Sequence, residues 1–271
     1  MAAMPTVDRP PWTAAELYRR GCATLLASWE EYARGATGAA VRRFPGVVAA
    51  VFPDGPERAV YNNAVLDAGL TADGRADAVD AMEAAYAAAG VTRFAAWTHE
   101  TDHAMRRELE RRGYVLDTTT RAMGLSLDDV RVPRPRIALG PATWPEYLRS
   151  EGLSPDFLRA ADHAALHVLV ARLDGTVVAA ALAYDHGDDC GIYNVGTVER
   201  ARRRGFGTAV TAAQVHDARA RGCTTASLQS TPMAESVYAA VGFRDLGRIL
   251  EFVPGWVRQL TDPEVTRSRQ G

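Results

Sequence analysis

The sequence predicts a mixed α/β protein built from two related halves. Short β-type apolar runs alternate with longer amphipathic segments, and both halves end on the same order of strand, helix and Gly-aromatic pair. A stretch with two prolines, 128–136, keeps neither helical nor strand periodicity. We therefore expect a first domain at 1–127, a linker at 128–136, a second domain at 137–262 and a tail at 263–271.

Each half is predicted to alternate strands and helices. In the first half, helices are expected at 13–32, 75–89 and 102–112, and strands at 46–52, 59–66, 93–97 and 114–127. In the second half, helices are expected at 144–149, 207–221 and 233–240, and strands at 167–173, 176–184, 190–198 and 224–229, with a last strand that ends at 253. Asp174 and Gly175 separate two apolar runs, as is typical of a two-residue hairpin turn.

The ends of the two halves share one plan. Strand 93–97, a helix and Gly113-Tyr114 close the first half, and strand 225–229, a helix and Gly242-Phe243 close the second. A long alanine-rich helix precedes each of these endings. This correspondence indicates an internal duplication.

The composition excludes several classes of function. All 31 basic side chains are arginine, so the chain offers no lysine for a Schiff base, a phosphate loop or a kinase-type site. A net charge of -2 provides no general field that would attract nucleic acid or an anionic membrane. We expect neither of them as a partner.

Cysteine usage and apolar runs indicate a cytoplasmic protein. Cys22, Cys190 and Cys223 have neither metal-ligand spacing nor an even count, so we expect a reducing compartment and no metal site. The longest apolar runs, such as 177–184, are far shorter than the roughly 20 residues of a membrane span. Residues 1–12 lack the basic start and apolar stretch of a signal peptide.

A loop rich in arginine and glycine lies between a predicted strand and a predicted helix, within 191–208. The first N–H groups of a helix have no acceptor within the helix and lie at the positive end of its dipole, so they favour a phosphate. Gly205 and Gly207 carry no Cβ that would hold a pyrophosphate away, and they permit dihedral angles that turn successive N–H groups inward. The loop therefore predicts an anion site.

The loop admits two other interpretations. Three consecutive arginines, 202–204, are more often a solvated surface run, and the spacing does not show which of them binds a phosphate. The dinucleotide fingerprint Gly-x-Gly-x-x-Gly is excluded because Val210 stands at the place of its third glycine.

This region, about 165–253, resembles the GNAT superfamily of N-acetyltransferases. The acetyl-CoA loop of that family reads Gln/Arg-x-x-Gly-x-Gly/Ala, and Arg202, Gly205 and Gly207 match each defined position. Ala234, Tyr238 and the Gly-Phe pair that follows resemble the second cofactor motif of the family. The resemblance implies two tandem GNAT-like domains, each a mixed, mostly antiparallel twisted sheet flanked by helices.

The resemblance also implies acetyl-CoA as co-substrate, with no metal. The residues that it implies for binding acetyl-CoA are Gly196, Thr197, Val198, Arg202, Arg203, Arg204, Gly205, Phe206, Gly207, Thr208, Thr231 and Ala234. Tyr238 would supply the proton for the departing thiolate, or it packs the core as an ordinary tyrosine. Backbone N–H groups of the splayed strand would hold the thioester carbonyl. Glu199 and Thr231 depart from the proline and asparagine common in the family.

The general base stays unassigned at this stage. Asp185, Asp188, Asp189 and His167 lie near the relevant strands in sequence, but each is more typical of a turn or surface position.

The first half lacks the chemical elements of the second. Its stretch 67–75 has no Arg-x-x-Gly-x-Gly spacing and places two aspartates where phosphates would lie, and Leu109 stands at the place of Tyr238. We predict a degenerate domain that binds no CoA and instead braces the second half or walls its acceptor cleft. Four residues of this half either face the acceptor or cap a loop: Trp97, His99, Glu100 and His103.

The predicted function is transfer of an acetyl group from acetyl-CoA to the primary amine of a small acceptor. The alternative is a non-catalytic acyl-CoA-binding or sensing module of the same fold. Transfer of an aminoacyl group from a charged tRNA is disfavoured by the near-neutral charge. The acceptor, the acyl-chain preference and the choice between monomer and homodimer stay open.

Overall fold

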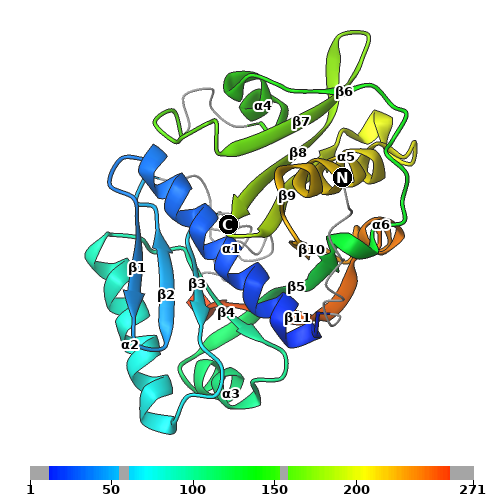
Figure 1. Ribbon diagram of the computed structural model, residues 1–271. Coiled ribbons are helices and arrows are strands. Elements are labelled where there is room, and N and C mark those ends of the chain that lie inside the picture. The colour runs from blue at the N-terminus through cyan, green and yellow to red at the C-terminus, as the bar shows by residue number, and fades with distance from the viewer. Residues whose placement is uncertain (1–11, 55–60, 153–157, 257–271) are drawn as a thin grey trace, which may run out of the picture.

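A single sheet of eleven strands forms the centre of the molecule (Figure 1). This computed structural model describes residues 12–54, 61–152 and 158–256, so the tail predicted at 263–271 lies outside the described residues. The strands are β1 (Ala40–Phe44), β2 (Val47–Val51), β3 (Asn63–Leu66), β4 (Ala95–His99), β5 (Tyr114–Ser126), β6 (Leu139–Gly140), β7 (Leu166–Leu173), β8 (Thr176–His186), β9 (Asp189–Thr197), β10 (Thr225–Ser230) and β11 (Arg244–Pro254).

Six α-helices pack on this sheet. They are α1 (Ala14–Gly35), α2 (Ala72–Ala88), α3 (His103–Arg111), α4 (Trp144–Ser150), α5 (Phe206–Arg221) and α6 (Glu235–Val241), with short 3-10 turns at Leu127–Asp129 and Glu199–Ala201. Every predicted helix and strand is present within a few residues. Asp174 and Gly175 have φ angles of 50° and 76°, which confirms the tight turn between β7 and β8.

Two strands were not predicted, β1 and β6. The sequence of β1 is Ala-Val-Arg-Arg-Phe, and most of it is exposed, so it shows neither an apolar run nor alternation. It lies at one edge of the sheet and β6, with two residues, at the other. An edge strand has one neighbour and buries little, so its sequence carries a weak signal.

The two halves exchange their last strands. The order across the sheet is β1-β2-β3-β4-β11-β5-β10-β9-β8-β7-β6. Thus β11, from the end of the second half, pairs with β4 of the first, while β5, from the end of the first half, pairs with β10 of the second. The predicted mixed, mostly antiparallel sheet flanked by helices is confirmed, and the sheets expected for the two halves are joined into one because each half completes the sheet of the other. The boundaries at 127 and 137 stay a prediction.

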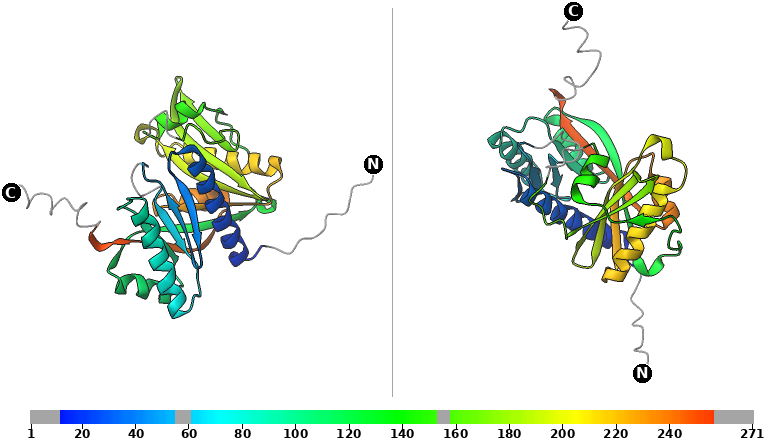
Figure 2. Two further views of the ribbon diagram at one scale, coloured as in Figure 1. Left: turned by 90° about the vertical axis from the view of Figure 1, so that its left-hand side faces the viewer. Right: turned by 90° about the horizontal axis from the view of Figure 1, so that it is seen from above.

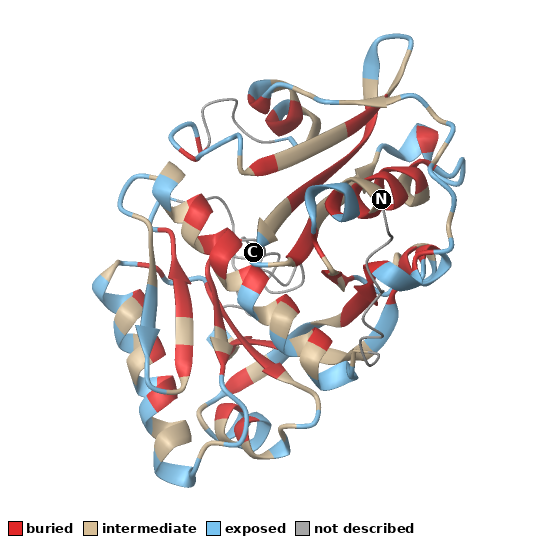
Figure 3. Cartoon of the chain, viewed as in Figure 1, coloured by how far each residue is buried: buried red, intermediate tan, exposed pale blue. Residues whose placement is uncertain are grey.

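The helices cover the sheet unequally. On β2, Ala50 and Phe52 face α1, whereas Val47, Ala49 and Val51 face α2, as the alternation of a strand requires. The face opposite α1 also carries α3, α5 and α6, while α4 packs on the same face as α1. In the left view of Figure 2, α1 and α2 lie on opposite sides of the first strands, and Figure 3 shows buried residues concentrated between helices and sheet.

Helix α1 belongs to the first half by sequence but is bound to the second. Its start carries a capping box, in which Thr13 and Glu16 bond each other's backbone N–H groups. Further along, Thr24 donates to the carboxylate of Asp189 over 2.7 Å, and Arg20 donates to Thr225 over 2.9 Å. A Cβ on Gly21 would lie 2.8 Å from Ser227, so glycine permits the close approach of this helix to β10.

The predicted linker at 128–136 packs against the second half. Val130 is buried, His216 bonds the carbonyl oxygen of Val132 over 3.0 Å, and Arg134 forms an ion pair with Asp217 of α5. The two halves are therefore connected by a segment that is itself fixed. None of the helices in the described part of the chain combines the length and apolar character that crossing a bilayer requires.

Because the halves share the β5–β11 pair, we expect the protein to unfold in one cooperative transition. Calorimetry and far-ultraviolet circular dichroism should give the same midpoint. Truncation after Phe243, which removes β11, should abolish the transition for both halves, whereas truncation after Trp256 should preserve it. Two separate transitions in the full chain would contradict the shared core.

Candidate active site

Strands β9 and β10 lie side by side at their start and then separate. Their parallel pairing joins three residue pairs, from Thr225 with Asp189 to Ser227 with Gly191. Beyond Gly191, β9 continues to Thr197 paired with β8 alone, through a register shift and a left-handed Asn194 (φ 50°). The edge of β9 that faces β10 therefore presents backbone groups with no ladder partner in the described part of the chain.

The separation of the two strands leads into a cavity of about 350 Å³. Thr231, Ala234 and Tyr238 line one side of it, and Val195 of β9 lines another. The opposite wall is formed by α1 and by strands of the first half, including Trp97 of β4. The cavity thus joins both halves of the chain at the place where the sheet divides.

Tyr238 both packs the core and lines this cavity. Its side chain is 6% exposed and its ring contacts Phe243 edge-on, with centroids 6.3 Å apart. Burial raises the pKa of Tyr238 to about 12. The hydroxyl is protonated at neutral pH, as it would be in an exposed tyrosine, and it lines the cavity as a hydrogen-bond donor.

The loop before α5 presents backbone N–H groups with no cap. Gly205 is the N-cap residue, with φ 79°, and no side chain bonds the first N–H groups of the helix. Arg203 is also left-handed, with φ 58°. Left-handed residues in such a loop turn their N–H groups toward a common centre, which forms a site for an anion.

Gly207 does not have the role expected for it in the backbone. Its φ angle is not positive, so the left-handed residues are Arg203 and Gly205 rather than Gly205 and Gly207. A Cβ on Gly207 would lie 3.7 Å from Thr197 Oγ1 and 3.8 Å from Val237, which are ordinary contact distances. The fold itself therefore tolerates a side chain here, and a ligand close to the backbone would explain the glycine.

The other predicted residues of this loop lie around it. Arg202 donates to the carbonyl oxygen of Thr197 over 3.2 Å, and the guanidinium of Arg204 lies 5.5 Å from the ring centre of Phe206. Phe206 is 6% exposed and belongs to the core, so it offers the site only its main chain. Thr208 follows in the first turn of α5, and Gly196, Thr197 and Val198 line a second cavity of about 200 Å³.

A carboxylate that the sequence analysis missed lies beside this strand. Glu151 ends α4 and lines the second cavity, and a Cβ on Gly196 would lie 3.4 Å from its Oε1. Burial raises the pKa of Glu151 to about 7. No local pattern marks this residue, because its burial depends on strands that follow it in the sequence.

The four candidates for a general base have structural roles. Asp185 forms an ion pair with Arg221 over 2.6 Å, and Asp188 with Arg20. Burial raises the pKa of Asp185, but hydrogen bonds from Arg221 and His167 outweigh it, so that the pKa lies well below its usual range. Asp189 is buried and accepts hydrogen bonds from three hydroxyl groups, those of Thr24, Thr225 and Ser227.

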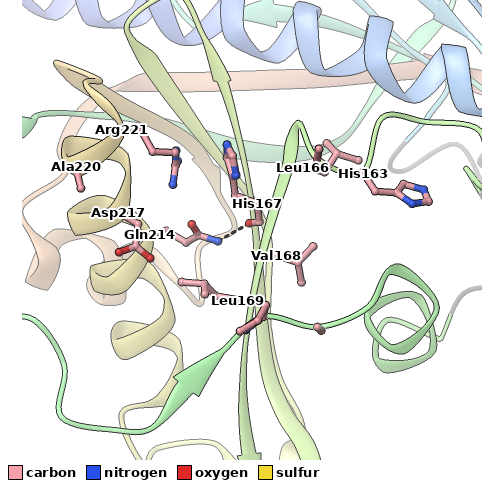
Figure 4. A pocket seen from close by; sticks show the side chains of 12 residues that line it. His163, Leu166, His167, Val168, Leu169, Gln214, Asp217, Ala220 and Arg221 are labelled. Atoms are coloured by element: carbon pink, nitrogen blue, oxygen red, sulfur yellow. Dashed lines mark hydrogen bonds between the residues drawn. The ribbon is translucent and has the colours of Figure 1, made fainter.

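His167 lies in a different groove, between β7 and α5 (Figure 4). Its carbonyl oxygen accepts a hydrogen bond of 2.7 Å from Gln214. This groove shares no lining residue with the cavity of Tyr238. None of the four candidates lines that cavity.

The equivalent place in the first half is closed. Thr71 caps α2 by accepting from the N–H of Gly74 over 3.1 Å, and Asp102 accepts from the N–H of Gly69 over 3.3 Å. Strand β3 pairs with β4 as far as Val65 of its four residues, so these strands leave no opening like that between β9 and β10. Leu109, at the place of Tyr238, is fully buried.

Of the four first-half residues that the sequence left open, Trp97 lines the cavity. His99 bonds Thr101 over 2.8 Å, and Glu100 accepts from the N–H of Arg248 over 2.8 Å, so both fix loops. His103 begins α3. Within the described ranges, no group of three His, Cys, Asp or Glu residues is placed to hold a metal ion.

Comparisons with known proteins bear on the family and on the fold. Residues 136–243 match the acetyltransferase (GNAT) family. The fold is similar to a GCN5-related N-acetyltransferase from Kribbella flavida (TM-score 0.67, 18% identity, 88% of this chain and 95% of that chain). It is also similar to one from Sphaerobacter thermophilus (TM-score 0.58, 16% identity, 89% and 93%). A search of curated proteins gave no match.

The protein is therefore a mixed α/β protein of the GNAT fold, with a mostly antiparallel open sheet flanked by helices. The match to the acetyltransferase (GNAT) family covers residues 136–243, which is less than half of the chain. The similarity to the Kribbella flavida structure extends over both halves of the chain.

We expect Glu151→Gln to remove a pH dependence of stability. The folded pKa of Glu151, about 7, exceeds the usual 4.5. The protein therefore loses the contribution of this carboxyl to its free energy of unfolding, which is fully present below pH 4.5, as the pH rises through 7. Relative to the unchanged protein, the variant should gain about 1 to 3 kcal/mol in free energy of unfolding between pH 4.5 and 7.5. Urea titrations measure this, with Asp77→Asn, at an exposed position of α2, as the control. An equal difference at both pH values would contradict the burial of this carboxylate.

Proposed function

We propose that the protein transfers an acetyl group from acetyl-CoA to the primary amine of a small acceptor. The observation that carries the proposal is the continuity of the site. The uncapped start of α5 adjoins the open edge of β9, and that edge leads to the cavity lined by Tyr238. A phosphate site, an extended strand edge and a proton donor thus follow one another in the order of the parts of acetyl-CoA.

The phosphates of acetyl-CoA fit the N–H groups between Arg203 and Thr208. The left-handed residues turn these groups inward, and the exposed arginines at 202–204 add positive charge. The pantetheine arm fits the open edge of β9 at Gly196–Val198. The N–H of Val198 bonds Val178 of β8 over 2.9 Å, so by strand alternation the backbone groups of Thr197 face the open side.

Acetyl transfer requires a neutral amine, a donor for the developing oxyanion and a proton for the leaving thiolate. The nitrogen of the amine bonds to the acetyl carbon, the carbon–sulfur bond breaks, and the nitrogen gives up its proton to solvent water. Unpaired N–H groups of β9 would stabilise the oxyanion, and Tyr238, whose phenol is protonated at neutral pH, would protonate the thiolate and be reprotonated by solvent. Thr231 and Ala234 would lie beside the thioester.

A non-catalytic acyl-CoA-binding module is the second candidate, because the phosphate site alone serves either function. The position of Tyr238 in the cavity favours the enzyme. Release of CoA in the presence of amines distinguishes the two functions, because a binding module releases none.

Substitution Gly207→Val should weaken acetyl-CoA binding by at least tenfold. The fold accepts a Cβ at Gly207, so the melting temperature should change little while the side chain fills the phosphate site. Calorimetric titration should also give one acetyl-CoA per chain. Asp73→Val, at the same position in the first turn of α2, is the matched control and should leave affinity unchanged. A second site per chain, or unchanged affinity in Gly207→Val, would refute the assignment.

Substitution Tyr238→Phe should lower kcat by about 100-fold, the usual loss of a positioned acid, with acetyl-CoA affinity unchanged. The thiol of released CoA can be followed by its reaction with a disulfide dye. Tyr86→Phe, which removes another buried hydroxyl in α2, is the control and should retain the rate. Full activity of Tyr238→Phe would exclude its role as the acid.

A further inference from the structure

Beyond Tyr238, the cavity extends under α1 to strands of the first half. Its far wall includes Tyr32 of α1, Asn63 of β3 and Trp97 of β4. These side chains are 5%, 1% and 8% exposed. Because acetyl-CoA would occupy the side near β9, the far wall is the place that remains for the acceptor.

Four polar atoms at this wall have no hydrogen-bond partner within the described residues. They are Tyr32 Oη, Asn63 Nδ2, Asn63 Oδ1 and Trp97 Nε1. Buried polar atoms are nearly always hydrogen-bonded, since leaving them unpaired destabilises the fold. Several unpaired polar atoms around one cavity indicate a ligand that forms hydrogen bonds with them.

The adjacent Asn62 shows that the lack of hydrogen-bond partners at Asn63 depends on the position and not on the residue type. Asn62 Oδ1 accepts from the N–H of Phe52 over 2.8 Å, and its Nδ2 donates to the carbonyl oxygen of Phe52 over 3.2 Å. Asn62 thus fixes the chain between β2 and β3, whereas Asn63 contributes no such bond. Trp29 contacts Trp97 edge-on, with centroids 5.6 Å apart, and so holds the indole in place.

We propose that Tyr32, Asn63 and Trp97 select a hydroxyl-rich ring amine, such as an amino sugar, as the acceptor. The proposal rests on the acetyl-transfer function and names its substrate class. Hydroxyl groups donate and accept, as the amide of Asn63 requires on its two atoms. The three side chains belong to three different elements. A molecule that carries several hydroxyl groups can therefore bond all three, whereas a single amide or an alkyl chain cannot.

Charge and size support this class of acceptor. Among the described residues that line the cavity there is no arginine or histidine to pair with the carboxylate or phosphate of an anionic acceptor. The rings of Trp29, Tyr32 and Trp97 provide flat apolar faces for a sugar ring. A volume of about 350 Å³ lies in the lower part of the range of small-molecule sites.

Binding can be measured without turnover, by calorimetry on the full chain saturated with CoA. The probes are D-glucosamine, cyclohexylamine, which has a ring and an amine but no hydroxyl, and β-alanine, which carries a carboxylate. We expect glucosamine to bind at least tenfold more tightly than either of the others. Asn63→Leu, which keeps the size of the side chain, should remove most of this preference and leave CoA affinity unchanged.

The melting temperature separates recognition from a structural role. Asn63→Leu should melt no lower than the unchanged protein, since Asn63 makes no hydrogen bond that the substitution breaks, whereas Asn62→Leu should melt lower. A lowered melting temperature in Asn63→Leu, with the preference for glucosamine intact, would overturn the proposal.

The remaining outcomes distinguish this inference from the proposed function. If cyclohexylamine or β-alanine binds and is acetylated as well as glucosamine, the acceptor class is wrong while the transferase function stands. If glucosamine binds with the expected preference but no amine releases CoA, the transferase function is wrong and the polar wall still defines the ligand.

Discussion

The antiparallel pair of β5 and β11 at the centre of the sheet is the interaction on which the rest of the structure depends. It runs from Arg244 opposite Gly124 to Pro254 opposite Tyr114. Without it, β4 and β10 would each present an unpaired edge in the middle of the molecule, with backbone groups cut off from water by α1. The pair also contributes to the site, since Thr120 of β5 and Glu251 of β11 line the cavity of Tyr238 together with Trp97.

The two halves show how one local structure serves two ends. Both have a strand, a loop and a long helix in the same order. The N-cap residue of α2, Thr71, accepts a hydrogen bond from an N–H group of the first turn, whereas the N-cap residue of α5, Gly205, has no side chain to do so. Capping stabilises a helix, and its omission leaves donors for another molecule. The first half thus contributes part of the cavity wall, and the uncapped N–H groups lie in the second half.

Local patterns in the sequence predicted most of this architecture. Periodicity located the helices and the inner strands, and the spacing of Arg202, Gly205 and Gly207 predicted an anion site at the loop before α5, because both depend on neighbours within a few residues. The left-handed residue at Arg203 was missed, since arginine carries no such preference. The unpartnered Asn63 and bonded Asn62 are identical in type and adjacent, so no pattern separates them.

What the sequence does not reveal depends on residues far apart along the chain. The exchange of strands is visible only from pairings such as that of Glu100 with Arg248, 148 positions apart. The raised pKa of Glu151 likewise comes from burial by strands that follow it. A duplicated sequence predicts two similar folds, but whether their last strands return to their own half is decided by packing across both.

The strand exchange also constrains the order in which the chain is made. During synthesis the first half leaves the ribosome complete in sequence, yet the edge of β4 remains open until β11, near the other end of the chain, has emerged. An open strand edge can pair with a second unfinished copy. In the nascent protein, pairing of β4 with its own β11 therefore competes with pairing to a strand of another unfinished copy on the same messenger RNA. Faster translation of the second half would favour the pairing within one chain.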